Sequence, residues 1–305
     1  MIRTDLLGAA VAGILRKGAC CVPRDVRSAF TEALQRENED RAREAFRSTL
    51  RSLDLSVERM NPACPDSGWP LFFVKAGNDV NLEGGFLALE AVVREQVAAA
   101  TAAGYLRATM KHPLTGYDPG TNVGPHVPDV TYQFVPGADL QVSYVAKGGG
   151  SECFGGTRYR MIAFADGLVG IKKFIVDAFA ASARAGAICP PPILGIGIGG
   201  TGNIAANLAK QAACLRLIGS RHPEPAIADL EDELLRGLNA LGIGPMGIGG
   251  QTSVFAVHVE YAYTHLAGIA VATSSNCWIA RRATVRIEAD GRLEDVDDPD
   301  WFNRR

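Results

Sequence analysis

The chain has 305 residues, of which 47% are hydrophobic, and a formal net charge of −2. This composition is sufficient for a sizeable buried core in one large domain or two smaller ones. With no basic tail and no block of like charges, the sequence argues against nucleic acid or a membrane surface as a partner.

No apolar run approaches the roughly 18 to 20 residues that a membrane span needs. The N-terminus lacks the apolar run and cleavage site of a signal peptide, so we expect a cytoplasmic protein without a membrane span. There, cysteines stay reduced and are available to metal rather than to disulfides. The chain has seven of them: Cys20, Cys21, Cys64, Cys153, Cys189, Cys214 and Cys277.

The first 60 or so residues predict helices with little loop between them. One helix runs near residues 6–17, and a second follows Pro23 and carries the heavily charged stretch 36–47. Residues 71–74 then predict a strand and 84–103 a helix with an alanine-rich end.

The Pro/Gly-rich stretch 113–128 predicts a long loop, and such loops in compact domains tend to be functional. Strands at 129–134 and 140–146, with the Pro136-Gly137 turn between them, predict a β-hairpin. The later elements are a long helix at 168–185, a strand at 193–198, helices at 203–215 and 224–241, and strands at 254–259, 268–272 and 283–287.

This order of elements indicates an α/β or α+β fold in which helices cover mixed sheets. We expect a helical N-terminal segment over residues 1–60, a main domain over 61–290 and a C-terminal tail over 291–305.

Three distant cysteines occur where regular secondary structure is interrupted: Cys64 and Cys189 precede prolines, and Cys277 lies between Asn276 and Trp278. A residue before proline is driven to extended geometry, so the chain is expected to turn there with the thiols free to converge. A [4Fe–4S] cube normally takes four cysteines, and three would leave one iron open as a Lewis acid. The alternative is that each cysteine is a small buried hydrophobe.

The residues around these cysteines resemble the alpha subunit of class I, iron–sulfur-dependent fumarases and tartrate dehydratases, over about residues 60 to 285. The matching stretches are Cys64-Pro-Asp66-Ser-Gly68, Phe72-Phe-Val-Lys75, Lys147-Gly-Gly-Gly-Ser151, Cys189-Pro-Pro191, Ile218-Gly-Ser-Arg221-His222-Pro223, Leu241-Gly-Ile-Gly-Pro245, His258-Val-Glu260 and Cys277-Trp-Ile-Ala-Arg-Arg282.

The chain departs from the family pattern at the first cysteine motif. Pro65 and Ser67 stand where the family usually has glutamine and threonine. Ser67 keeps a hydroxyl, whereas Pro65 removes a backbone donor and stiffens the loop. The run 218–223 and the Cys277-Trp278 pair are closer to tartrate dehydratases, and Lys147-Gly-Gly-Gly-Ser151 is closer to fumarases, so the diacid stays open.

The resemblance implies a fold like the alpha domain of class I fumarases and a [4Fe–4S] cluster held by Cys64, Cys189 and Cys277. It implies a hydro-lyase that reversibly adds or removes water at a small dicarboxylic acid, converting L-tartrate to oxaloacetate or interconverting fumarate and malate. It also implies a separate beta subunit that carries the remaining catalytic residues, in a heterotetramer of two alpha and two beta chains.

The same resemblance implies roles for individual side chains. Asp66 is expected to orient the water or hydroxyl on iron, and Arg107 to bind a substrate carboxylate through its bidentate guanidinium. His265, twelve residues before Cys277, is expected to hydrogen-bond the substrate or relay a proton. A surface aspartate and a helix-end arginine are the structural alternatives.

Lys147 is expected to supply positive charge at an active-site loop. The glycines that follow it, Gly148, Gly149 and Gly150, would let backbone amides approach the cluster or substrate closely. The alternative is a flexible loop without function. Cys153, just beyond, matches no ligand position.

Gly195-Ile-Gly197-Ile-Gly199-Gly200 matches the G-x-G-x-x-G fingerprint, which makes an NAD-dependent oxidoreductase the rival hypothesis. The ribose-binding acid expected about 20 residues on is missing, and a tight strand-to-helix turn with close packing also explains the glycines. A structural zinc protein is a third reading, but the chain has no close CxxC pair. His258 and Glu260 would share a strand face and could form a polar pair.

Overall fold

The computed structural model describes residues 1–303 and divides the chain into two compact units. Unit 1 comprises Met1–Pro23, Ser52–Lys147 and the chain from Arg281 onwards, and unit 2 comprises Arg24–Arg51 and Gly148–Ala280. The expected boundaries near residues 60 and 290 stay predictions, because each unit combines separate stretches of the chain.

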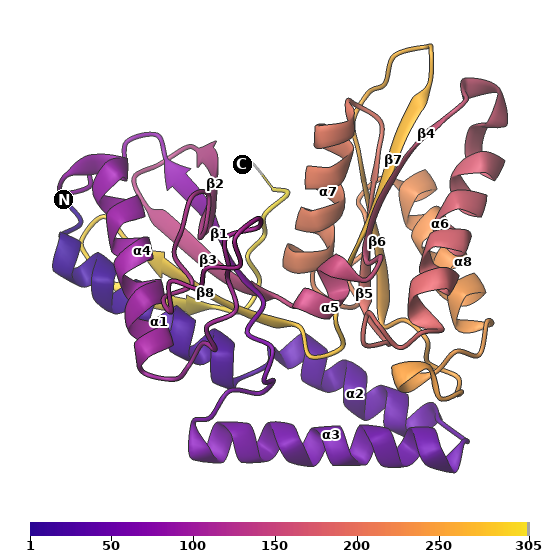
Figure 1. Cartoon of the computed structure of the whole chain (residues 1–305). Coiled ribbons are helices and arrows are strands. Elements are labelled where there is room, and N and C mark those ends of the chain that lie inside the picture. The colour runs from indigo at the N-terminus through magenta and orange to yellow at the C-terminus, as the bar shows by residue number, and fades with distance from the viewer. Residues whose placement is uncertain (304–305) are drawn as a thin grey trace. The chain divides into compact units, whose positions relative to one another are not determined.

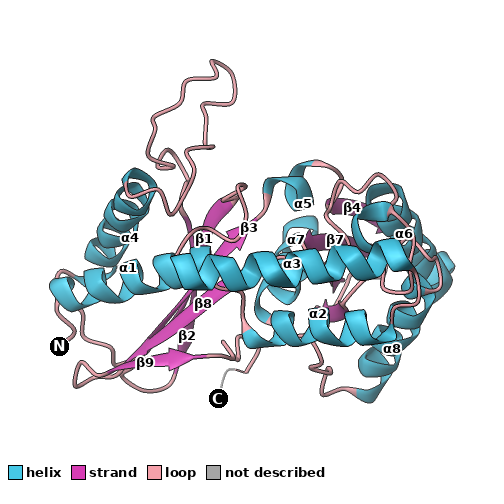
Figure 2. Cartoon of the chain, turned by 90° about the horizontal axis from the view of Figure 1, so that it is seen from below, coloured by secondary structure: helices cyan, strands magenta, loops and turns pink. Residues whose placement is uncertain are grey.

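Unit 1 is a mixed sheet with helices on one face (Figures 1 and 2). β2 runs parallel to β1, while every other neighbouring pair of strands is antiparallel. The helices are α1 (Thr4–Cys20) and α4 (Gly85–Ala102), and the strands, in the order β2-β1-β3-β8-β9, are Asp129–Val135, Trp69–Gly77, Leu140–Lys147, Arg281–Ile287 and Leu293–Val296.

Helix α1 forms because apolar side chains recur at helical spacing, and they pack into the core of unit 1. By length and composition alone, the stretch Thr4–Arg36 could cross a membrane. The structure divides it into α1 and α2 (Arg24–Arg36), and Leu7, Val11 and Leu15 are fully enclosed in the core. These contacts account for the apolar composition of α1.

Unit 2 is a four-stranded sheet with helices on both faces (Figure 1). Its strands, in the order β4-β7-β5-β6, are Thr157–Ile162, Ile269–Asn276, Ile193–Ile198 and Ala256–Tyr261. Helix α7 (Gly202–Leu215) covers one face, and α6 (Gly167–Ala183) and α8 (Pro225–Asn239) cover the other. The remaining elements are α3 (Asp40–Arg59), α5 (Gly149–Cys153) and the short 3₁₀ helices η1 (Phe164–Asp166) and η2 (Pro245–Gly247).

The glycines of β5 are explained by packing against α7. A Cβ at Gly195 would collide with the Ala209 carbonyl, and one at Gly197 with the Ala205 carbonyl. Beyond the strand, the N–H of Gly199 donates to Ala270 O at 2.7 Å and that of Gly200 to Tyr263 O at 3.2 Å, which leaves neither for a pyrophosphate. The expected tight turn with close backbone packing is confirmed.

The predicted β-hairpin is wrong. β2 and β3 are not neighbours, because β1 lies between them and pairs with both. β1 is buried along most of its length, whereas β2 carries partly exposed side chains, so the more apolar strand takes the inner position. The Pro136-Gly137 turn instead packs against Gly77 and accepts the Asp79 N–H.

Three further elements differ from expectation. The charged helix predicted after Pro23 is two helices, because buried Glu37 accepts the N–H groups of Asn38 and Glu39 on its own carboxylate and ends α2 there. The exposed strand β4 and helix α5 were not predicted. β9 lies in the expected tail, where Trp301 is buried.

Candidate functional site

The Cys64 loop of unit 1 follows α3 as a tight bend over residues 63–65. The N–H of Ala63 donates to Ala19 O at 2.9 Å and fixes the start of the loop. Asp66 Oδ1 accepts the Gly68 N–H at 2.9 Å, and Gly68 has a φ of 67°, which glycine adopts readily. The half-buried, free thiol of Cys64 is therefore held on a closed loop.

Two arginines fasten this loop from other parts of unit 1. The backbone N–H of Arg107 donates to the buried hydroxyl of Ser67. The Arg281 guanidinium donates to the Asp66 carbonyl at 2.6 Å. The side chain of Arg107 is exposed beyond the end of α4. Unit 1 thus has Cys64 and Asp66 on one loop and Arg107 hydrogen-bonded to that loop through its backbone.

Lys147 ends β3 and lies opposite Trp69 on β1, the residue directly after Gly68. Only 1% of its surface is exposed. The register of the two strands therefore places this ammonium-bearing residue beside the exit of the Cys64 loop, which the sequence alone could not show.

Unit 2 brings Cys189 and Cys277 into adjacent loops. Cys189 has a φ of 51°, a left-handed conformation uncommon for residues other than glycine. Its carbonyl accepts the N–H of Trp278 at 3.1 Å. Cys277 is 7% exposed and follows β7 where Asn276 pairs with Ile193 at the start of β5. Both thiols lie at the same end of the sheet.

An aromatic cluster positions the Cys277 loop. The ring centroid of Trp278 is 5.4 Å from that of Phe30 on α2 and 6.4 Å from that of Phe46 on α3, and Phe30 also contacts Phe255. Helices α2 and α3 thus support the residue beside a cysteine of the site.

The glycine run after Lys147 is a short helix in place of the expected loop. Gly148 precedes α5, and a Cβ on Gly150 would lie 2.7 Å from Ala187 O, two residues before Cys189. Glycine at 150 is therefore required by close packing against the Cys189 loop. Cys153 is exposed at the end of α5.

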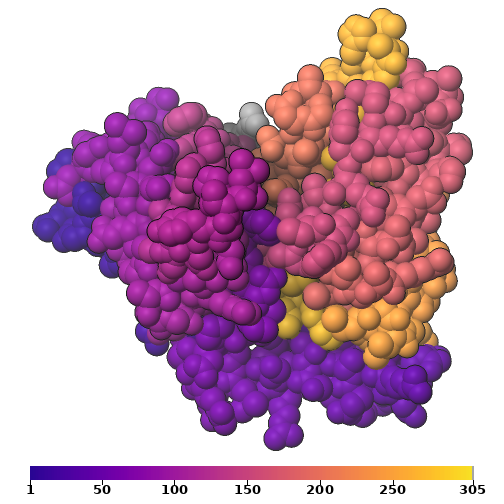
Figure 3. Space-filling model, in the orientation of Figure 1, coloured from indigo at the N-terminus to yellow at the C-terminus, as the bar shows by residue number. Residues whose placement is uncertain are grey.

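His265 lies elsewhere in unit 2. It is exposed in the segment 262–268 between β6 and β7, which protrudes at the upper end of the unit in Figure 3. β7 separates it from Cys277, and eight strand residues at roughly 3.3 Å each span about 26 Å. The spacing of twelve residues does not bring His265 to Cys189 and Cys277 of its own unit.

A buried ion network holds the loop that carries the 218–223 motif. Arg216 donates to Glu231 at 2.5 Å and to Glu260 on β6 at 3.3 Å, and His222 Nε2 lies 3.8 Å from Glu260. Glu231 also accepts the Val259 N–H at 2.8 Å. Burial raises the pKa of Glu260 to about 7, although Arg216 acts in the opposite direction. Glu260 thus pairs with Arg216 in a structural network.

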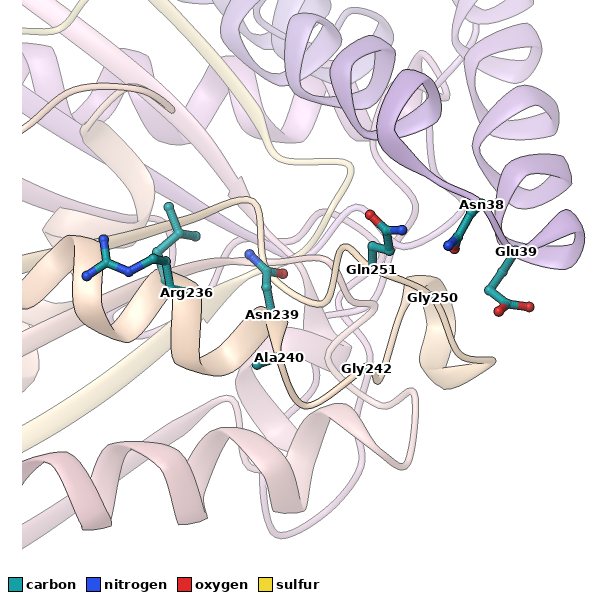
Figure 4. A pocket seen from close by; sticks show the side chains of 9 residues that line it. Asn38, Glu39, Arg236, Asn239, Ala240, Gly242, Gly250 and Gln251 are labelled. Atoms are coloured by element: carbon teal, nitrogen blue, oxygen red, sulfur yellow. The ribbon is translucent and has the colours of Figure 1, made fainter.

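The cavity in Figure 4 has a volume of about 750 Å³ and none of the expected site residues line it. Figure 4 shows Arg236 and Asn239 on α8, with Asn38 and Gln251 from neighbouring segments. Asn239 accepts the N–H groups at 253 and 254, so its side chain holds the local backbone. This surface gives no indication of a reaction site.

Over residues 1–303, no group of three or more His, Cys, Asp or Glu side chains is arranged around a single metal ion. A cluster differs from a single ion, because three thiolates on a cube bind three different irons and lie further apart. None of the seven cysteines, all of which lie within residues 1–303, forms a disulfide. A set of thiolates from Cys64, Cys189 and Cys277 has the soft donor chemistry that iron–sulfur clusters require.

The comparisons with known proteins agree with one another. The family described as Fumarate hydratase (Fumerase) matches residues 9–286. A protein of Methanocaldococcus jannaschii, provisionally assigned as L(+)-tartrate dehydratase subunit alpha, is 37% identical over 285 residues, which is 93% of this chain and 98% of that protein. The L(+)-tartrate dehydratase alpha subunits of Escherichia coli UTI89 and K12 are 35% and 34% identical over 276 residues, covering 90% of this chain and 88% of theirs. Because the matches cover nearly the whole chain, it belongs to the fumarate hydratase family of hydro-lyases.

Proposed function

We propose that this chain is the alpha subunit of a hydro-lyase and that Cys64, Cys189 and Cys277 hold a [4Fe–4S] cluster. The observation that carries the proposal is the hydrogen bond from Trp278 N–H to Cys189 O, which pairs two cysteine loops 88 residues apart in sequence. The uncommon backbone of Cys189 supports a functional position, since strained residues concentrate at such sites. Cys64 adds the third thiolate from a loop fastened at both ends.

When bound, the cluster supplies an iron without a protein ligand, which is a Lewis acid for a substrate oxygen. The side chains of the chain would bind and orient the diacid around it. Arg107 would take one carboxylate through its guanidinium fork, and Asp66 would orient the water or hydroxyl that is added or lost. Both side chains are accessible enough to do so.

Lys147 would offset the negative charge of the dicarboxylate, and Gly148, Gly149 and Gly150 would allow close approach of the substrate to the backbone. His265 would hydrogen-bond a substrate or relay a proton. Since β7 separates it from Cys277, it would act at a site other than one formed beside the cysteines of its own unit.

The substrate is proposed to be a small dicarboxylic acid: L-tartrate, which loses water to give oxaloacetate, or fumarate, which gains water to give malate. The names of the relatives support tartrate. Their designation as subunit alpha supports a separate beta subunit, which we propose carries the base and further arginines in a cytoplasmic heterotetramer of two alpha and two beta chains.

The cluster is tested on anaerobically reconstituted protein by iron and sulfide analysis with EPR. Wild type should hold about four irons per chain. Cys64→Ala, Cys189→Ala and Cys277→Ala should each lose them. The control is Cys153→Ala, whose exposed thiol is not a proposed ligand and which should keep the cluster. Absence of iron from the wild type, or equal loss in the control, would contradict the proposal.

The reaction is tested by supplying the cluster-loaded chain with L-tartrate, fumarate or malate, with and without a co-expressed beta chain. We expect turnover of one diacid only when the beta chain is present. Full turnover by the isolated chain would exclude the two-subunit arrangement while leaving the hydro-lyase assignment intact.

A further inference from the structure

Arg281 is a buried cation whose charge is not compensated within unit 1. Only 1% of its surface is exposed. Within residues 1–303, its single hydrogen bond is the one that Nη2 donates to the carbonyl of Asp66, and Nε is buried without an acceptor. No carboxylate of residues 1–303 forms an ion pair with it. A guanidinium has five N–H donors, so most of its capacity is unused.

Such a group is costly unless something compensates it. Taking an ion out of water is strongly unfavourable, and one neutral carbonyl does not compensate a full charge. Arg281 faces the apolar core, because alternate residues of β8 share a face of the sheet and this face carries Ala283, Val285 and Ile287. A sequence selected only for folding would place an apolar residue at 281.

A second buried polar atom lies nearby and also lacks a partner. The hydroxyl of Tyr144 is fully buried and forms no hydrogen bond with any residue from 1 to 303. Tyr144 pairs with Ala283, and Arg281 pairs with Ala146, so Tyr144 and Arg281 are diagonal neighbours on one face of the β3–β8 pair. Two underused polar groups at this end of the sheet indicate that a charged group belongs beside the Cys64 loop.

We propose that Arg281 is a positioning residue for the cluster: it compensates the negative charge of the Cys64 thiolate and its cluster, and it holds the Asp66 carbonyl so that the first ligand loop keeps its shape. This inference rests on the proposed function. The cluster is the anion that the hydrogen bond of Arg281 favours, because this bond goes to the backbone two residues after Cys64. A substrate carboxylate is the competing anion.

The test compares Arg281→Met with wild type as full-length, anaerobically reconstituted chains. The rate of iron loss to a chelator should rise about tenfold or more, the lower range for losing a residue that supports a metal ligand. The midpoint potential of the cluster should become more negative, because removing a cation disfavours the added electron. Arg281→Lys keeps the charge and should stay closer to wild type in potential.

The melting temperature of the cluster-free chain separates this role from a purely structural one. Replacing an unpaired buried cation by an apolar side chain of similar length should leave it unchanged or raise it. The matched control is Arg286→Met on the same strand, whose side chain bonds Glu294 at 2.9 Å near the surface and which should alter neither iron loss nor potential.

The outcomes are distinct. A wild-type chain that takes up no cluster overturns both the proposed function and this inference. A wild type with about four irons, matched by Arg281→Met in iron loss and potential, overturns the inference alone. A raised KM for the diacid in Arg281→Met, measured with the co-expressed beta chain and with an unchanged cluster, would assign Arg281 to the substrate and overturn the inference. If Arg281→Met lowered the melting temperatures of the cluster-free and the cluster-loaded protein equally, Arg281 would only stabilise the fold, and the inference would be overturned.

Discussion

Replacing Glu260 by glutamine should make the stability of the chain less dependent on pH. Glu260 lies in the buried network with Arg216, Glu231 and His222. Burial is the main cause that raises its pKa from 4.5 to about 7, and Glu231 adds to it, whereas Arg216 opposes it. A glutamine keeps the size and an acceptor for Arg216 but cannot ionise.

The direction in which the free energy of unfolding changes with pH follows from proton binding. Between about pH 4.5 and pH 7 the folded chain holds a proton on Glu260 that the unfolded chain has released. The free energy of unfolding therefore falls as pH rises through this window, by at most about 1.4 kcal/mol per pH unit, and the loss is complete above it. A shift of roughly 2.5 units corresponds to about 3 kcal/mol as an upper bound.

The assay is chemical unfolding of wild type and Glu260→Gln at pH values from 5 to 8. Relative to wild type, the variant should gain about 1 to 3 kcal/mol of stability between the two ends of this range. The control is Glu233→Gln, which removes an exposed ion pair with Lys172 and should shift stability by less than about 1 kcal/mol at any pH. Parallel pH profiles for wild type and Glu260→Gln would refute the reasoning.

Three further changes test the packing and placement described above. Gly197→Ala should destabilise the chain by about 1 to 3 kcal/mol, because the new Cβ would collide with the backbone of α7. The control Gly237→Ala, in open space on α8, should stabilise the chain by about 0.5 to 1 kcal/mol, and thermal melting that showed the same effect for both variants would contradict the packing. Tyr144→Phe should stabilise the cluster-free chain by about 1 kcal/mol in denaturant titrations, because the buried hydroxyl of Tyr144 has no hydrogen-bond partner within residues 1–303. A clear loss of stability would show that the hydroxyl does have a partner. His265→Ala should leave the iron content of reconstituted protein at the wild-type value, because its loop lies at the far end of β7; iron loss would show that the placement is wrong.

Most elements could be predicted from the sequence because their patterns are local. β5 was predicted at its observed bounds, and α4 within one residue at each end. The order of strands could not be predicted, because the apparent hairpin between β2 and β3 competes with pairing to a more apolar strand. That strand is β1, which ends 52 residues before β2 begins and lies between β2 and β3. The break at Glu37 was missed because its carboxylate is also fixed by the N–H of Gln251, far along the chain.

The candidate site shows the same difference between chain distance and spatial distance. Cys189 and Cys277 are 88 residues apart, yet one backbone hydrogen bond joins their loops, while His265 and Cys277 are twelve apart and a whole strand separates them. The motif Cys277-Trp-Ile-Ala-Arg-Arg282 contains Arg281 but indicates no role for it. A local signal was present, because an arginine in alternation with Ala283, Val285 and Ile287 falls on the apolar face of a strand. A buried charge on the apolar face of a strand lowers the stability of the fold, so we expect a functional reason for the arginine at this position.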